Sequence, residues 1–190
     1  MSKGRSVSEI QALLDKTGFT RLGENRLEEA KLKLPYFKEC EKHYLGKLQS
    51  RKIPEIVALF DVIQTVESLK QATLISKQEK EIKVFLQVNL DGSPERSGCK
   101  PSEASELIGK IQKLPFLKLI GVMGMASQGP KLAREQFKSL KALQAELSEC
   151  SMGMSSDYHL AIEEGATMLR LGRCLFENKE LALPNGIELE

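Results

Sequence analysis

The chain has 190 residues, of which 41% are hydrophobic, and its 28 basic residues nearly balance its 26 acidic residues. This length predicts one domain with a substantial core, and a net charge of +2 gives no electrostatic footprint for nucleic acid. No apolar run approaches a membrane span, so we expect no membrane association. Four widely spaced cysteines without CxxC pairing predict a reduced cytoplasmic compartment, and two histidines far apart in sequence do not predict a metal site.

The first half of the chain alternates between helical and strand-like patterns. Ser6 to Glu9 resembles a capping box, and the apolar stripe after it predicts a helix that stops at Gly18. Strands are predicted near residues 20, 43, 63 and 85, with helical patterns between them. The segment 82–90 is the clearest strand, because it mixes β-branched and aromatic residues and is followed by turn residues.

The alternation continues in the second half of the chain. Helices are predicted over 101–113, 131–147 and 156–165, and strands near residues 120, 151 and 169. Residues 179–190 are polar, so we expect a barrel domain over residues 1–178 followed by a loosely attached tail.

Seven strands separated by helices predict a parallel sheet of the α/β class. A closed (β/α)8 barrel of the TIM type needs eight strands. The competing architecture is an open doubly wound sheet, but no Gly-x-Gly-x-x-Gly follows a strand.

The segments 150–157 and 162–172 carry the most specific chemistry. Each has small residues at a predicted strand end, which bring backbone N–H groups and a hydroxyl close together. Such groups can hold a phosphate dianion, and β/α barrels often bind phosphate in the loops after the last two strands. The two segments therefore predict a barrel and a phosphorylated ligand.

An ordered series of short motifs identifies a resemblance over nearly the whole chain, from Ser2 to about Phe176. The motifs are Gly23-Glu-Asn25, Leu45-Gly-Lys-Leu-Gln-Ser50, Gln87-Val-Asn89 with Ser97-Gly98, Gly121-Val-Met123, Ser151-Met-Gly-Met-Ser155 with Asp157, and Arg170-Leu-Gly172. The series resembles the pyridoxal 5′-phosphate (PLP) homeostasis protein family. The resemblance implies a barrel like the N-terminal domain of alanine racemases, with PLP as the cofactor.

The resemblance implies roles for residues at the reactive end of the cofactor. Lys3 would carry PLP as a Schiff base, and Arg170 would approach the pyridine nitrogen. Asn25 would line the pocket and Met152 would wall it. The alternatives from the residues alone are a solvated lysine, a salt bridge for Arg170, a helix cap for Asn25 and a core position for Met152.

At the phosphate end, Ser155 would donate its hydroxyl, and Gly172 would allow close backbone approach. The family usually has a small hydroxyl residue where Arg173 stands, so Arg173 would instead supply charge. The alternative for Ser155 is an ordinary helix N-cap.

One feature departs from the family. Its members have a helix and an apolar first strand ahead of the lysine, whereas this chain starts two residues before Lys3. With that first strand missing, we expect a gap at the edge of the barrel.

The resemblance implies a monomeric carrier of PLP that supplies apo-enzymes, without catalytic turnover. A racemase of this lineage also needs a tyrosine from a second domain, and no tyrosine here lies in such a motif. The alternatives are a small PLP-dependent racemase or lyase, and a truncated chain that cannot bind PLP.

Overall fold

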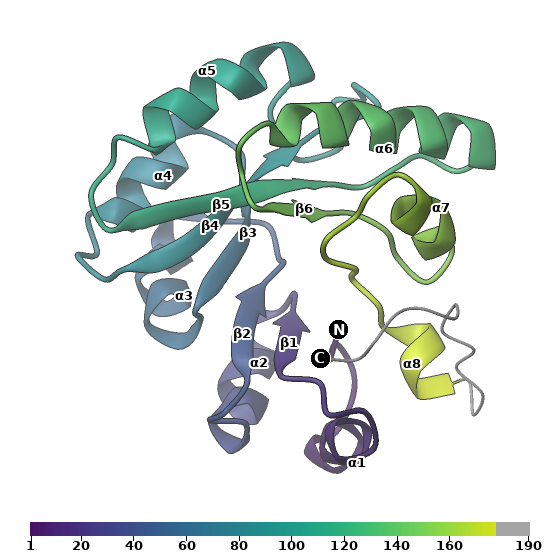
Figure 1. Ribbon diagram of the computed structural model, residues 1–190. Helices are drawn as coiled ribbons and strands as arrows, with labels where there is room; N and C mark the ends of the chain where they lie inside the picture. Colours follow the sequence, from purple (N-terminus) through teal and green to yellow (C-terminus); the bar gives the residue numbers. More distant parts are fainter. Residues whose placement is uncertain (178–190) are drawn as a thin grey trace.

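The computed structural model describes residues 1–177 and shows a curled parallel sheet with helices around it (Figure 1). The strands are β1 (Arg21–Glu24), β2 (Glu41–Tyr44), β3 (Val62–Val66), β4 (Ile82–Val88), β5 (Leu117–Gly124) and β6 (Glu149–Ser151). Their order in the sheet follows their order in the chain, and every pair is parallel. In a doubly wound sheet the strand order reverses at a switch point. The order here does not reverse, so it confirms the barrel-type alternative.

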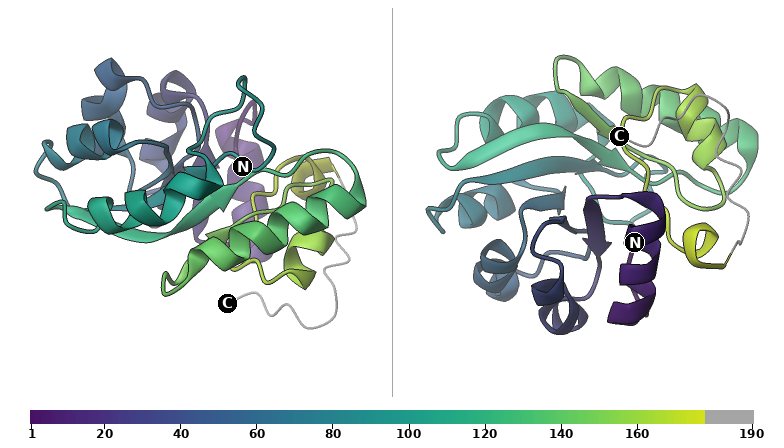
Figure 2. Two further views of the ribbon diagram at one scale, coloured as in Figure 1. Left: turned by 90° about the horizontal axis from the view of Figure 1, so that it is seen from above. Right: turned by 60° about the horizontal axis from the view of Figure 1, so that its bottom comes forward.

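The helices lie on the outer face of the curled sheet (Figure 2). They are α1 (Val7–Thr17), α2 (Leu27–Lys33), α3 (Ile53–Leu59), α4 (Leu69–Ser76), α5 (Pro101–Ile111), α6 (Pro130–Gln144), α7 (Tyr158–Glu163) and α8 (Arg173–Glu177), with short 3₁₀ turns at Leu34–Tyr36 and Ser50–Lys52. The capping box of α1 is confirmed, because the Ser6 and Glu9 side chains each bond the other residue's amide, and Gly18 ends the helix in the left-handed conformation. In residues 1–177 no helix is both long and apolar enough to cross a bilayer.

The predicted seventh strand at 167–171 is wrong, because this segment makes only an isolated bridge from Met168 to Ser151. The amides of Thr167 and Met168 both donate to the carbonyl oxygen of Cys150, so the ladder loses its regular spacing. Gly153, with φ of +89°, then turns the chain away from β6. The segment still runs beside the residues after β6, because the Arg170 amide donates to the Gly153 carbonyl at 2.9 Å.

The expected gap at the edge of the barrel is present, because β1 and β6 are the unpaired edges of the described six-stranded sheet, but two hydrogen bonds partly bridge it. The amide of Ser2 donates to the carbonyl oxygen of Gly23 in β1 at 2.9 Å, and the Met1 amine donates to that of Leu171 at 2.7 Å. Ser2 is 1% exposed. The first two residues therefore bridge β1 and the segment before α8, and the N-terminus lies between them in Figure 1.

Side chains alternate between the two faces of the sheet, as parallel strands require. One face packs against the helices and forms the main core. On the inner face, Val62, Phe85 and Met123 form a second apolar cluster with Ile120 and Met168. The polar residues His43, Gln64 and Ser151 are also buried among the strands. The domain boundary at 178 stays a prediction, and the tail over 179–190 lies outside the described residues.

Candidate functional site

Lys3 lies at the carboxyl end of β1, where barrel proteins of this class place their sites. Its neighbour Ser2 pairs with Gly23, near the end of β1. Lys3 and Gly4 form a turn that the Arg5 amide closes by donating to the Ser2 carbonyl at 3.1 Å, with Gly4 at φ +70°. The backbone is therefore fixed on both sides of Lys3, while its side chain is exposed.

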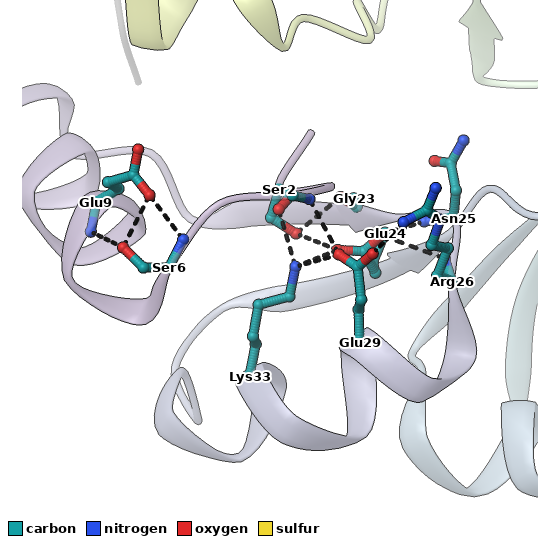
Figure 3. Close-up of polar contacts among 10 residues, drawn as sticks. Ser2, Ser6, Glu9, Gly23, Glu24, Asn25, Arg26, Glu29 and Lys33 are labelled. Atoms are coloured by element: carbon teal, nitrogen blue, oxygen red, sulfur yellow. Dashed lines mark hydrogen bonds and ion pairs between the residues drawn. The ribbon is translucent and has the colours of Figure 1, made fainter.

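A buried ionic cluster on β1 and α2 holds this turn (Figure 3). Lys33 Nζ donates to the Ser2 carbonyl at 2.9 Å, to Glu24 Oε2 at 2.7 Å and to Glu29 Oε2 at 3.1 Å. Glu29 Oε2 also accepts the Gly4 amide at 3.0 Å. Hydrogen bonds from Gly4, Arg26 and Lys33 lower the pKa of Glu29 to about 2. The cluster thus forms hydrogen bonds with the backbone of both Ser2 and Gly4, the residues on either side of Lys3.

Sequence reasoning missed the three members of this cluster. Two signals were available. Glu24 is an ionisable residue at a strand position that alternation buries, and Glu29 and Lys33 have the i, i+4 spacing of a helical ion pair.

Asn25 follows β1, and its side chain points away from the cluster in Figure 3. Its Oδ1 atom is buried and has no hydrogen-bond partner. The helix-cap alternative is wrong, because α2 begins after Arg26 without a side-chain cap. A buried carbonyl oxygen without a partner is costly, so Asn25 is suited to accept a hydrogen bond from a ligand.

Arg170 is 8% exposed, and its guanidinium lies at the carboxyl ends of the neighbouring strands β5 and β6. Its Nη1 donates to Ser151 Oγ at 2.9 Å, and its Nη2 donates to the carbonyl oxygen of Gly124 at 2.8 Å. Among residues 1–177 no carboxylate forms a salt bridge with it, so the salt-bridge alternative is wrong for the described chain. Burial lowers the pKa of Arg170 to about 10, which still leaves the guanidinium charged at neutral pH.

The turn after β6 and the start of α8 meet at Ser155. The amide of Cys174 approaches Ser155 Oγ at 3.5 Å. Ser155 does not cap α7, because Asp157 is the N-cap residue there and its carboxylate accepts the Met154 amide at 2.6 Å. The Ser155 hydroxyl therefore keeps most of its hydrogen-bonding capacity.

The other predicted residues near the phosphate end differ in their exposure. Gly172 lies against Met1, so a Cβ built on it would lie 3.3 Å from the Met1 Cβ. Arg173 begins α8 and is exposed. Met152 is fully buried in the main core, with its Sδ 3.7 Å from the Cys150 sulfur, so the structure places its side chain with the core residues.

Several of the predicted residues lie on segments that follow the carboxyl ends of strands, whereas Met152 lies in the main core. Asn25 follows β1, Ser155 follows β6, and the carboxyl ends of parallel strands lie at the same edge. The bond from Met1 to Leu171 joins the Lys3 turn to the segment that carries Arg170 and Gly172. A cavity of about 410 Å³ follows the carboxyl ends of β2, β3 and β4, and its lining, which includes Lys47, Glu67 and Arg96, contains none of the predicted residues.

A curled parallel sheet with polar groups gathered at its carboxyl end defines a barrel protein of the alanine racemase type, and residues 2–179 match the family described as the alanine racemase N-terminal domain. Curated relatives are named pyridoxal phosphate homeostasis proteins. That of Pasteurella multocida is 32% identical over 195 residues, which cover 93% of this chain and 83% of the relative. That of Escherichia coli K12 is 30% identical over 194 residues, covering 93% and 82%. The chain belongs to the pyridoxal phosphate homeostasis protein family.

Solved structures agree with this assignment. PipY of Synechococcus elongatus has been solved without PLP and with PLP bound, and it matches this chain with TM-scores of 0.86 and 0.82. Both matches are 31% identical and cover 92% of this chain and 89% of PipY. Alanine racemase of Clostridium difficile matches with a TM-score of 0.70 at 18% identity, covering 88% of this chain and 47% of the racemase, and shares the fold.

Proposed function

We propose that this chain binds PLP in vitamin B6 homeostasis, with Lys3 as the residue that reacts with the aldehyde. The observation that carries the proposal is Arg170, a buried guanidinium whose protein partners are a hydroxyl and a carbonyl. A buried charge without a counter-charge is costly unless it has a further partner. PipY, a relative with PLP bound in one of its structures, supports PLP as that partner.

The groups at this end of the barrel fit PLP. Asn25 has a buried oxygen without a donor, Ser155 has an almost free hydroxyl, and Gly172 presents backbone without a side chain. Arg170 stays protonated at neutral pH, so it can only donate to the pyridine nitrogen. Ser155, Gly172 and Arg173 are the residues that we assign to the phosphate, as donors of hydroxyl, amide and charge.

PLP supplies a reactive aldehyde and an electron-withdrawing ring when it is bound. Arg170 as a donor keeps the ring nitrogen unprotonated, which weakens the ring as an electron sink. Lys3 needs a free amine to react, and its exposure at the turn leaves it accessible. These properties favour holding the cofactor over turning over an amino acid.

We therefore infer that the chain stores PLP and passes it to apo-enzymes as a monomer in the cytoplasm. The tyrosines support the absence of turnover. Tyr44 is 3% exposed in the main core, Tyr36 is 70% exposed next to α2, and the Tyr158 ring is tilted by 46° against that of its neighbour His159, with centroids 4.0 Å apart. Two-sided proton transfer needs a second positioned base. Among the described residues, no contact places any of these tyrosines opposite Lys3.

The test compares the unaltered chain with Lys3→Ala and with Lys118→Ala, an exposed lysine at the opposite, amino end of β5. PLP is added, borohydride is used to trap any covalent adduct, and the modified peptide is located by mass spectrometry. We expect a single adduct on the peptide with Lys3, retained in Lys118→Ala and lost in Lys3→Ala. An adduct that persists in Lys3→Ala overturns the anchor, and no binding by the unaltered chain overturns PLP as the ligand.

The racemase or lyase alternative is tested with the same loaded protein. Amino acids are added in deuterated water, and exchange at the α-carbon is followed by NMR. We expect no exchange above the rate of free PLP, and catalysed exchange would overturn the carrier assignment.

A further inference from the structure

A chain of buried polar side chains crosses the inside of the barrel and ends at Arg170. Arg170 Nη1 donates to Ser151 Oγ at 2.9 Å, and Ser151 Oγ donates to Gln64 Oε1 at 2.7 Å. Gln64 Nε2 lies 2.8 Å from His43 Nδ1, and His43 Nε2 lies 3.0 Å from Glu41 Oε2. Residues 43, 64, 151 and 170 are each at most 8% exposed. Ser151 and Gln64 belong to β6 and β3, which are not neighbours in the sheet, so their bond spans the interior.

The donor and acceptor of each hydrogen bond in the series from Glu41 to Arg170 are set by these two end residues. A carboxylate can only accept, so Glu41 requires the proton of His43 on Nε2. A neutral ring then leaves Nδ1 as an acceptor for the amide nitrogen of Gln64. This places the amide oxygen of Gln64 toward Ser151, whose hydroxyl donates to it and keeps a lone pair for the Arg170 guanidinium.

The charges around His43 support its neutral form. The charged groups that face it are Glu41, Arg21 and Lys83, and Arg21 and Lys83 both form ion pairs with Glu41. Burial lowers the pKa of His43, and the attraction of Glu41 only partly offsets this effect. For Glu41, burial opposes ionisation, but contacts with Lys83 and His43 outweigh it and lower the pKa of Glu41.

The interior does not need polar residues in order to be filled. On the same inner face, Phe85, Val62 and Met123 pack as an apolar cluster. Apolar side chains of similar volume would avoid the cost of burying an amide and an imidazole. The polar chain instead leads to the one guanidinium that our proposed function assigns to the cofactor ring.

We propose that Gln64 and His43 are positioning residues for Arg170, acting through Ser151. The neutral imidazole orients the Gln64 amide, the amide orients the Ser151 hydroxyl across the interior, and the hydroxyl holds the guanidinium at the ends of β5 and β6. Protonation of His43 would place a donor against the Gln64 amide hydrogens and reverse this order. The cofactor part of the proposal rests on the proposed function, whereas the positioning itself concerns the protein without cofactor.

The first test measures hydrogen exchange of the Arg170 guanidinium by NMR in the ligand-free protein. The variants His43→Leu and Gln64→Met remove a link, and His43→Gln keeps one acceptor and one donor. Thr65→Val is the matched control, because Thr65 is similarly buried beside Gln64, but its hydroxyl donates to the Gly46 carbonyl and takes no part in the hydrogen bonds that lead to Arg170. We expect exchange about tenfold faster or more in the first two variants, as for the loss of a hydrogen bond to a charged group, and unchanged exchange in His43→Gln and Thr65→Val.

Unchanged exchange in a folded Gln64→Met variant overturns the proposal, as does faster exchange in Thr65→Val. The unaltered protein supplies a measurement that no folding defect can obscure. Intrinsic guanidinium exchange is base-catalysed and slows as the pH falls, so protection is expressed as the intrinsic rate divided by the measured rate at each pH. We expect this ratio for Arg170 to decrease as His43 becomes protonated below pH 6.5. Protection that does not follow the titration of His43 overturns the proposal.

PLP binding is then compared in the same variants. We expect affinity about tenfold weaker or more in Gln64→Met and restored in His43→Gln, in parallel with the exchange data. If the unaltered chain binds no PLP, the proposed function fails while the exchange data still test the positioning of Arg170.

Discussion

The ammonium group of Lys33 lies 2.9 Å from the carbonyl oxygen of Ser2, the residue immediately before Lys3. Lys33 is on α2, and Ser2 pairs with β1, so this contact joins the N-terminal segment, β1 and α2. The same ammonium is paired with the fully buried carboxylate of Glu24. A short segment that crosses the edge of the barrel is therefore held by a charged helix residue as well as by backbone pairing.

The first prediction concerns this contact. Lys33→Met leaves Glu24 as a buried carboxylate without its counter-charge, and we expect the free energy of unfolding to fall by about 3–5 kcal/mol. Urea denaturation measures the change. The control is Lys31→Met on the same helix, whose ion pairs with Glu28 and Glu55 are exposed, and which should leave stability nearly unchanged. Adding Glu24→Gln to Lys33→Met should recover part of the loss, and no recovery would contradict the pairing.

The second prediction concerns the phosphate end of the site. Ser155→Ala removes a hydroxyl that has only a weak contact within the protein, so we expect little change in stability. Retention of PLP should weaken by about 1–3 kcal/mol, the usual scale for a hydrogen bond to a charged group. Equilibrium dialysis against PLP measures it. Ser156→Ala changes the exposed neighbouring serine and should bind as the unaltered chain does.

The third prediction concerns the turn between β6 and Ser155. Gly153 has φ of +89°, and a Cβ built on it would lie 2.6 Å from the Cβ of Ala161 and 3.0 Å from Leu169 Cδ2. We expect Gly153→Ala to lower the melting temperature and to cost about 1–3 kcal/mol from backbone strain alone. Gly92→Ala is matched in backbone conformation, with φ of +72° and open space around it. Calorimetry of the two variants should show the larger loss for Gly153→Ala, and equal losses would remove the steric part of the argument.

The fourth prediction is a dependence of stability on pH. Burial lowers the pKa of His43 below its ordinary value of 6.5, so the unfolded chain takes up a proton at a higher pH than the folded chain does. Stability is then fully present above pH 6.5 and is lost as the pH falls through the lower folded pKa. We expect a smaller loss in His43→Gln when urea midpoints are compared between pH 7.5 and pH 5.5.

The comparison between the two proteins is needed because a second group titrates in the same direction. Burial lowers the pKa of the Met1 amine from 8.0 to about 6, and this group is present in both proteins. The difference between them therefore isolates His43. An identical pH profile in His43→Gln would contradict the neutral, buried state of the imidazole.

Local sequence patterns were reliable where one element depends on its own residues. The capping box at Ser6 and the glycine stop at Gly18 define α1 as expected, and the strand predicted near residue 63 forms over Val62–Val66. The pattern failed at 167–171, where the residues favour a strand but β6 has only three residues to pair with. Whether such a segment becomes a strand depends on its neighbour's length, which is a property of the assembled sheet.

The candidate site divides in the same way. Motif order pointed to Asn25, Ser155 and Arg170, each of which the structure places at the carboxyl end of the barrel or inside it. The same reasoning placed Met152 in the pocket wall, whereas strand alternation directs its side chain into the main core. His43 and Gln64 carried no signal of their own, since an isolated histidine or glutamine in an apolar strand is usually a satisfied core residue.

By itself, the amino-acid sequence determined the alternation of strands and helices and the chemical types of the site residues, because hydrophobic periodicity and turn residues act over short distances. Only the tertiary structure decided how the edge of the barrel is bridged, since Met1 reaches Leu171 across 170 positions of the chain. It also decided that Arg170 has a hydroxyl and a carbonyl as partners among the described residues. Such pairings depend on which side chains the curled sheet brings into the same buried space, and no local pattern encodes that.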